Sequence, residues 1–156
     1  MEQIFWRDTE GFDLRAREQA EALLSDAAEV FSVVRDDGAA SPLMWCHLGE
    51  LFSELCDLPR ARYAYDAALS GDPSCADAWY GLALVSIDCG KVVDAMRNLR
   101  NSLTFAPHRA SPHFHLGRIL DKLGRTEQAE IHWKACLELA GEGSLAEMAR
   151  RRLAPR

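Results

Sequence analysis

Four of the five histidines lie between positions 108 and 132, and they are His108, His113, His115 and His132. Imidazole nitrogens are common zinc ligands, but ligation requires several of them to converge at about 2 Å from one ion. His113 and His115 are two positions apart, and such positions on a helix face in different directions. We therefore expect no metal site and no other cofactor.

Five cysteines make an odd count without a CxxC pair, and they are Cys46, Cys56, Cys75, Cys89 and Cys136. The first twelve residues mix charged and apolar side chains, which is not typical of an export signal. We therefore expect reduced thiols in a cytoplasmic protein. Cys89 and Cys136 are expected to be buried for packing, and Cys46 and Cys75 to be exposed, with a redox function of the exposed pair as the alternative.

The net charge of −6 belongs to the N-terminal part of the chain. Residues 1–41 hold ten acidic and four basic side chains, whereas residues 42–156 hold fourteen of each. Domains that bind nucleic acid usually carry a basic excess, so nucleic acid is not the expected partner. The basic end of the chain, Arg150, Arg151, Arg152 and Arg156, is typical of a helix C-terminus, where cations stabilise the macrodipole. An anionic partner for this end is the alternative.

The sequence contains none of the common catalytic motifs that we sought. There is no phosphate-binding loop, nucleophile elbow, metalloprotease helix or dinucleotide-binding fingerprint. The longest apolar stretch, around 79–87, is about half of the roughly 20 residues that a membrane-spanning helix requires. We therefore expect neither an enzyme nor a protein inserted in a membrane.

From Pro42 onward the sequence aligns with itself when it is shifted by 34 residues, and by 34 again. The columns that agree are Trp45, Trp79 and His113; Leu48, Leu82 and Leu116; Gly49, Ala83 and Gly117; Ala61, Ala95 and Ala129; Tyr65, Leu99 and Trp133; Ala68, Ser102 and Cys136; Leu69, Leu103 and Leu137; and Pro73, Pro107 and Gly141. Within a unit, apolar residues recur at helical spacing, which predicts two amphipathic helices that bury their stripes against each other.

This pattern resembles the tetratricopeptide repeat (TPR), whose Trp, Leu-Gly, Tyr, Ala, Phe, Ala and Pro positions match across residues 42–141. The departures are His113 in the Trp column, Ser86 in the Tyr column and Gly141 in the last Pro column. The resemblance implies an all-α fold, a TPR-type right-handed superhelical stack of helical hairpins (an α-α superhelix). It also implies a binding protein rather than an enzyme.

The expected order is an N-terminal tail (1–13), an N-terminal helix or degenerate half-repeat (14–37), three repeats (42–75, 76–109 and 110–141) and a C-terminal capping helix (144–156). Ala27 and Phe31 lie one period before Ala61 and Tyr65, which favours a half-repeat. Gly11 stands where a tryptophan would be expected, so a plain capping helix is the equal alternative.

Several residues are typical of helix ends. Ser41 and Ser111 each precede a proline, which predicts an N-cap followed by a first-turn proline. Gly90 and Gly124 are expected to break the chain between paired helices.

The last helix has its own start signal. Ser144 is followed three residues later by Glu147, which predicts a capping box there.

In this family the first helices of successive repeats line a concave groove that holds a partner segment. The matching positions here, which we call the groove residues, are Cys46, His47, Glu50, Glu54, Tyr80, Leu84, Ile87, Asp88, Phe114, His115, Arg118 and Lys122. Apolar anchors are expected at Tyr80, Leu84, Ile87 and Phe114. The alternative is that these side chains are covered by the C-terminal helix or by the tail with Phe5 and Trp6.

The charges of the groove residues differ between its ends. Glu50 and Glu54 make the first-repeat end acidic, whereas Arg118 and Lys122 make the third-repeat end basic, so a partner could be oriented by sign. Family members that grip the C-terminal carboxylate of heat-shock chaperones have a lysine and an asparagine where this chain has Cys46 and Glu50. The resemblance therefore argues against that role.

The function expected from the sequence is that of a protein–protein interaction module or adaptor. Its partner would be a peptide or helix held in the groove. Two alternatives remain: a bacterial secretion-type chaperone for a hydrophobic cargo protein, which is similar in layout only, and a structural protein that assembles as a homo-oligomer.

Overall fold

The computed structural model describes residues 14–37 and 40–154. These residues form α1 (Leu14–Asp37), α2 (Pro42–Glu54), α3 (Leu58–Gly71), α4 (Ala76–Asp88), α5 (Val92–Phe105), α6 (Ala110–Lys122), α7 (Thr126–Ala140) and α8 (Ser144–Leu153). The expected tail 1–13, with Phe5, Trp6 and Gly11, lies outside the described residues, as does Arg156.

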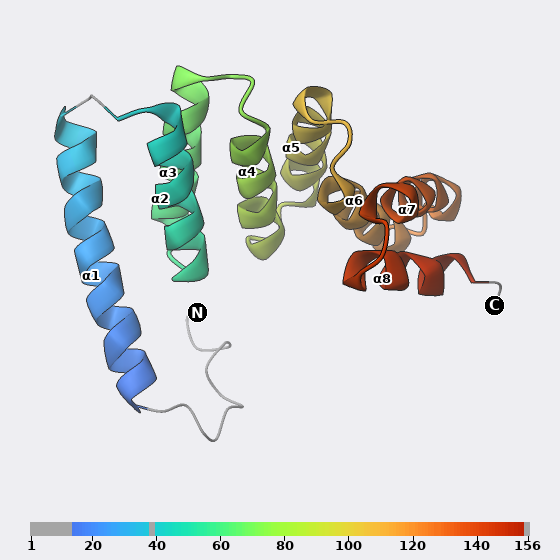
Figure 1. Ribbon diagram of the computed structural model, residues 1–156, viewed down its shortest axis with the longest axis horizontal. Coiled ribbons are helices and arrows are strands. Elements are labelled where there is room, and N and C mark those ends of the chain that lie inside the picture. The colour runs from blue at the N-terminus through green and yellow to red at the C-terminus, as the bar shows by residue number, and fades with distance from the viewer. Residues whose placement is uncertain (1–13, 38–39, 155–156) are drawn as a thin grey trace.

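The helices pack in the order of the chain. The pairs α2–α3, α4–α5 and α6–α7 form helical hairpins, and α8 packs on α7 and α6. Figure 1 shows α1 to α5 standing side by side, with the α6–α7 hairpin turned out of that direction and α8 lying across it. The prediction of an all-α stack of helical hairpins is confirmed. None of the described helices combines the length and the apolar character that spanning a bilayer would require.

One of the three predicted N-cap signals is confirmed. The Ser41 hydroxyl accepts a hydrogen bond from the Met44 amide at 3.2 Å, with proline in the first turn of α2. The prediction for Ser111 is wrong because α6 begins at Ala110, two residues before the predicted first-turn proline Pro112, so Ser111 lies inside the helix.

The capping box predicted in α8 is also wrong. The cap position is Gly143, whose carbonyl accepts from the Glu147 amide, and no side chain caps the helix. The Glu147 carboxylate pairs with Arg151 one turn further along instead.

α1 packs its Ala27 and Phe31 against the first hairpin. The Phe31 ring meets Trp45, Phe52 and Tyr63 edge-on, with ring centroids 5.2 to 5.8 Å apart. Ala27 and Phe31 lie one period before Ala61 and Tyr65 in the sequence. All four side chains are buried.

Tyr65 is the side chain that joins the first two repeats. A Cβ added at Gly49 of α2 would lie 2.6 Å from the Tyr65 ring, and one added at Gly81 of α4 would lie closer still. Both helices therefore need glycine where they face this ring. Gly49 belongs to a repeat column, but Gly81 shares its column with His47 and His115, so the sequence pattern gave no sign of its role.

The turns inside the hairpins use the left-handed backbone region. Gly90 and Gly124 have φ of 70° and 71°, which confirms them as the breaks between paired helices. The equivalent residue of the first hairpin is Cys56, at φ 59°. Cys89 lies beside the second turn and is exposed, so its predicted burial is wrong, whereas Cys136 is buried in the core as predicted.

Candidate functional site

The groove residues come from α2, α4 and α6, and the structure leaves ten of the twelve at least partly accessible. His47, Glu50, Glu54, Asp88, Arg118 and Lys122 are exposed, while Tyr80, Leu84, Ile87 and His115 are partly exposed. The two exceptions are Cys46 and Phe114, with 2% and 7% of their surface exposed.

Phe114 is a core residue, so its predicted exposure as an apolar anchor is wrong. Its ring stands edge-on to Trp133 of α7, with centroids 5.4 Å apart. The Arg118 guanidinium lies 5.5 Å from the centroid of the Phe114 ring, in cation–π contact. The Phe114 ring therefore packs inside the α6–α7 hairpin and is covered by the Arg118 side chain.

An aromatic junction connects α4 to α6 at the centre of the surface. The rings of Tyr80 and His115 lie with centroids 5.8 Å apart, and the Arg109 guanidinium stacks 5.4 Å from the Tyr80 ring. Arg109 also pairs with Asp77 at the start of α4. This junction holds the two helices in register through side chains rather than through close backbone packing.

The junction is electrically neutral at its rings. Burial, reinforced by the positive charge of Arg118, lowers the pKa of His115 from 6.5 to about 4, so the imidazole is uncharged at neutral pH. Burial raises the pKa of Tyr80 above its usual value, so its hydroxyl keeps its proton. The centre of the surface therefore presents neutral rings together with the partly exposed Leu84 and Ile87 of α4.

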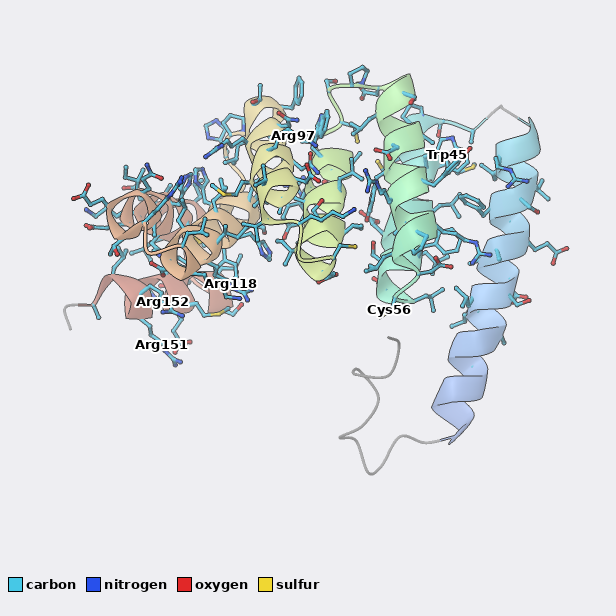
Figure 2. The ribbon with its side chains drawn as sticks, turned by 180° about the vertical axis from the view of Figure 1, so that it is seen from behind. Trp45, Cys56, Arg97, Arg118, Arg151 and Arg152 are labelled. Carbon is cyan, nitrogen blue, oxygen red and sulfur yellow. The ribbon has the colours of Figure 1, made fainter. Side chains whose placement is uncertain are left out.

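Charged side chains flank this neutral centre. Glu50 and Glu54 project from α2 on one side, and Arg118 and Lys122 from α6 on the other. The basic side continues into α8, because the labelled Arg118, Arg151 and Arg152 gather at the same end of the molecule in Figure 2 and α6 contacts α8. The surface is thus polarised along the stack.

The surface is open rather than enclosed. Two small hollows of the described residues, of about 100 and 160 Å³, lie elsewhere, and none of the groove residues lines either of them. The first lies among α3, α4 and α5, and the second among α6, α7 and α8. An open surface of this kind suits an extended or helical segment better than a small molecule.

Cys46 lies beneath this surface, and its predicted exposure is wrong. Its sulfur lies 3.2 Å from that of Cys75, the residue that precedes α4 and is itself partly buried. Burial, the contact with Cys75 and the negative charges of Asp77 and Glu50 raise the pKa of Cys46 to about 12. The thiol of Cys46 is therefore protonated at neutral pH.

Two histidines do come together in the third repeat, which the sequence did not indicate. The Nδ1 atoms of His113 and His132 lie 3.0 Å apart. Burial lowers the pKa of both, and that of His132 falls to about 4 with help from the charges of His113 and Arg100. Over the described part of the chain, His, Cys, Asp and Glu form no group of three or more that could hold a metal ion.

The chain is similar in sequence to human Tetratricopeptide repeat protein 8, with 28% identity over 88 residues. That alignment covers 56% of this chain and 16% of the human protein, so the chain spans much less than the length of this relative. The corresponding mouse protein is 27% identical over 88 residues. No protein-family model matches the chain.

Solved structures resemble the fold over most of its length. A tetratricopeptide repeat protein from Parabacteroides merdae superimposes with a TM-score of 0.71 at 19% identity, covering 87% of this chain and 56% of that one. The first TPR of Spaghetti (RPAP3), bound to an HSP90 peptide, gives 0.65 at 15% identity, covering 72% and 90%. YrrB, described as a TPR protein with an unusual peptide-binding site, gives 0.63 at 25% identity, covering 70% and 56%.

The relatives and the structures agree with the columns that recur every 34 residues and with the hairpins that those columns form. The chain therefore has the fold of a tetratricopeptide-repeat protein.

Proposed function

We propose that this chain binds a peptide or helical segment of another protein across α2, α4 and α6. The observation that carries the proposal is the neutral patch of Tyr80, Leu84 and Ile87, which are partly exposed along α4 and flanked by opposite charges on α2 and α6. Partly exposed apolar side chains beside a charged rim are typical of the centre of a binding surface.

Two of the structural neighbours support the class of ligand. RPAP3 was solved with an HSP90 peptide bound, and YrrB is described as having a peptide-binding site. YrrB, at 25% identity, gives the stronger support for a peptide ligand. The likeness to RPAP3, at 15% identity, reflects the shared fold alone. A peptide ligand for this chain is inferred by analogy with these proteins. The residues that would contact the peptide are inferred from the exposure and charge of the groove residues.

The charges favour a partner different from the acidic HSP90 peptide SRMEEVD of the RPAP3 complex. At the α2 end, the carboxylate of Glu50 is exposed and Cys46 is buried, so no cation is available from either position. An acidic C-terminus would be repelled there. We propose instead a segment with an apolar centre, basic residues toward α2 and acidic residues toward α6.

Selection from a random-sequence peptide library on the immobilised chain tests this proposal. The enriched peptides should carry one or two apolar residues between a basic and an acidic part. The double variant Leu84→Ala and Ile87→Ala should weaken their binding about tenfold or more, measured by fluorescence anisotropy. Charge reversal at Arg118 and Lys122 should weaken it several-fold and make the remaining affinity less sensitive to salt.

The matched control lies on other faces of the stack. Val93 of α5 and Ile131 of α7 are 81% and 66% exposed and carry the same aliphatic chemistry. Replacing these two by alanine should leave peptide affinity unchanged. Equal losses from the α4 pair and from this control pair, or enriched peptides with no common charge order, would contradict the proposed surface.

The secretion-chaperone and homo-oligomer hypotheses stay predictions. The library experiment separates the first from simple peptide binding, because a chaperone of that kind would favour long hydrophobic cargo over short selected peptides.

A further inference from the structure

Cys46 and Cys75 are the pair of thiols that the fold brings into contact. They lie 29 positions apart in sequence, on α2 and on the residue before α4, and their sulfurs are 3.2 Å apart. A disulfide bond needs the sulfurs at about 2.05 Å, so closing the gap requires about 1 Å of side-chain movement. The 29-residue separation is shorter than the 34-residue period, so this contact joins two different columns of the repeat.

From this contact we infer that Cys46 and Cys75 form a dithiol–disulfide site that links α2 to the start of α4 when a disulfide oxidant is present. This goes beyond peptide binding and stands independently of it. The oxidant class is a low-molecular-weight disulfide, of which glutathione disulfide is the probe.

The order of events follows from accessibility. Cys75 is partly exposed and Cys46 is 2% exposed, so the Cys75 sulfur meets the oxidant first. As its thiolate, Cys75 attacks one sulfur of glutathione disulfide, the glutathione S–S bond breaks, and one glutathione leaves as a thiol after taking a proton from water. Cys75 then carries glutathione in a mixed disulfide beside Cys46.

The second step closes the bond. The Cys46 sulfur loses its proton to solvent and attacks the Cys75 sulfur, and the bond from Cys75 to glutathione breaks to release a second glutathione thiol. In total two protein thiols are oxidised and one glutathione disulfide is reduced to two thiols. The high pKa of Cys46 slows this step, but the part of the shift due to Cys75 disappears once Cys75 is no longer a thiol. Glu50 and Asp77 remain as the facing negative charges, so closure should speed up with rising pH.

The bond would clamp neighbouring first helices together. Its loop spans the whole of α3, which carries the shared Tyr65 ring, and a cross-link over such a loop restricts the unfolded chain. The exposed Cys56 and Cys89 serve as internal controls, because they are open to the same oxidant.

The test is oxidation of the full chain with glutathione disulfide, followed by mass spectrometry of non-reduced peptides and by thermal unfolding. We expect a peptide pair joined through Cys46 and Cys75 that has lost two hydrogen atoms. We also expect glutathione adducts at Cys56 and Cys89, and a rise in Tm of about 10 °C that a dithiol reductant reverses. Cys46→Ala should trap the glutathione adduct on Cys75 and abolish the rise in Tm.

Cys75→Ala gives the second arm in case Cys46→Ala does not fold, and circular dichroism of the reduced variants checks folding. This variant should leave Cys46 reduced after treatment and show no rise in Tm. A stable glutathione adduct on Cys75 of the unsubstituted chain with Cys46 still reduced would overturn the inference. Cross-linking through other cysteines, or unchanged Tm after complete cross-linking, would do so as well.

Discussion

Tyr65 and Trp133 occupy the same column of the repeat, yet they are used differently. Tyr65 fills the space between Gly49 of its own hairpin and Gly81 of the next, so one ring serves two repeats. Trp133 lies against Gly117 and Phe114 of its own hairpin, and its Nε1 donates to the Asp121 carboxylate at 3.0 Å. The N-terminal half of the stack is thus joined by a shared ring. In the C-terminal half the ring stays within its hairpin, and α8 packs over that hairpin.

The largest expected effect is at the shared ring. Gly81→Ala should lower the free energy of unfolding by about 3 kcal/mol, because the added methyl group overlaps the Tyr65 ring, which is held on both sides. Gly117→Ala should cost less, about 1 to 2 kcal/mol, because its Cβ would lie 2.8 Å from a Trp133 ring that faces a single glycine. Urea denaturation measures both.

A double-mutant cycle checks that the ring is the cause. With Tyr65→Leu in the background, Gly81→Ala should cost much less, because the smaller side chain leaves room for the methyl group. If Gly81→Ala cost the same in both backgrounds, the comparison between the two rings would fail.

An intermediate effect is expected from acid on the third repeat. His115 and His132 have their pKa lowered from 6.5 to about 4, so the unfolded chain binds more protons between these values. Their stabilising effect is complete above about pH 6.5 and is lost as the pH falls toward 4. Allowing for partial exposure, we expect the two together to lower the free energy of unfolding by about 2 kcal/mol between pH 7 and pH 5.

The pH experiment has its own control. The variant with His115→Asn and His132→Asn should show a flatter decline of the urea midpoint over the same range. A decline as steep as that of the unsubstituted chain would assign the acid sensitivity to carboxylates elsewhere.

The smallest expected effect compares the turns of the hairpins. Cys56→Gly should raise the free energy of unfolding by about 1 kcal/mol, because glycine adopts the left-handed backbone at φ 59° without the clash of a Cβ. Gly90→Ala should lower it by about the same amount, since it introduces that clash into the second hairpin. Thermal unfolding under reducing conditions measures both, and Cys56→Ala, expected to be neutral, shows whether loss of the thiol alone matters.

The fold could be predicted from the sequence because several columns need a side chain of similar size in every repeat. Leu48, Leu82 and Leu116 recur for that reason, and all three are buried. Gly81 could not be predicted in this way, because it faces a ring of the preceding repeat and its own column holds two histidines. The repeat pattern thus reports packing inside a hairpin better than packing between hairpins.

The candidate site was predicted less well for a related physical reason. Helical position alone says which side of α6 Phe114 is on, but not that its ring turns inward to Trp133 while Arg118 covers it. The contacts of Cys46 with Cys75 and of His113 with His132 join helices at separations of 29 and 19 residues, neither of which equals the period. Only the three-dimensional arrangement brings these pairs together.

The position of the Tyr65 ring has a consequence for how the molecule comes apart. A cut between residues 75 and 76, where one repeat ends and the next begins, would remove the Gly81 wall from the ring and expose it to water. The segment that loses its structure as one cooperative body is therefore expected to be α3 together with α4, offset by half a period from the unit that repeats in the sequence.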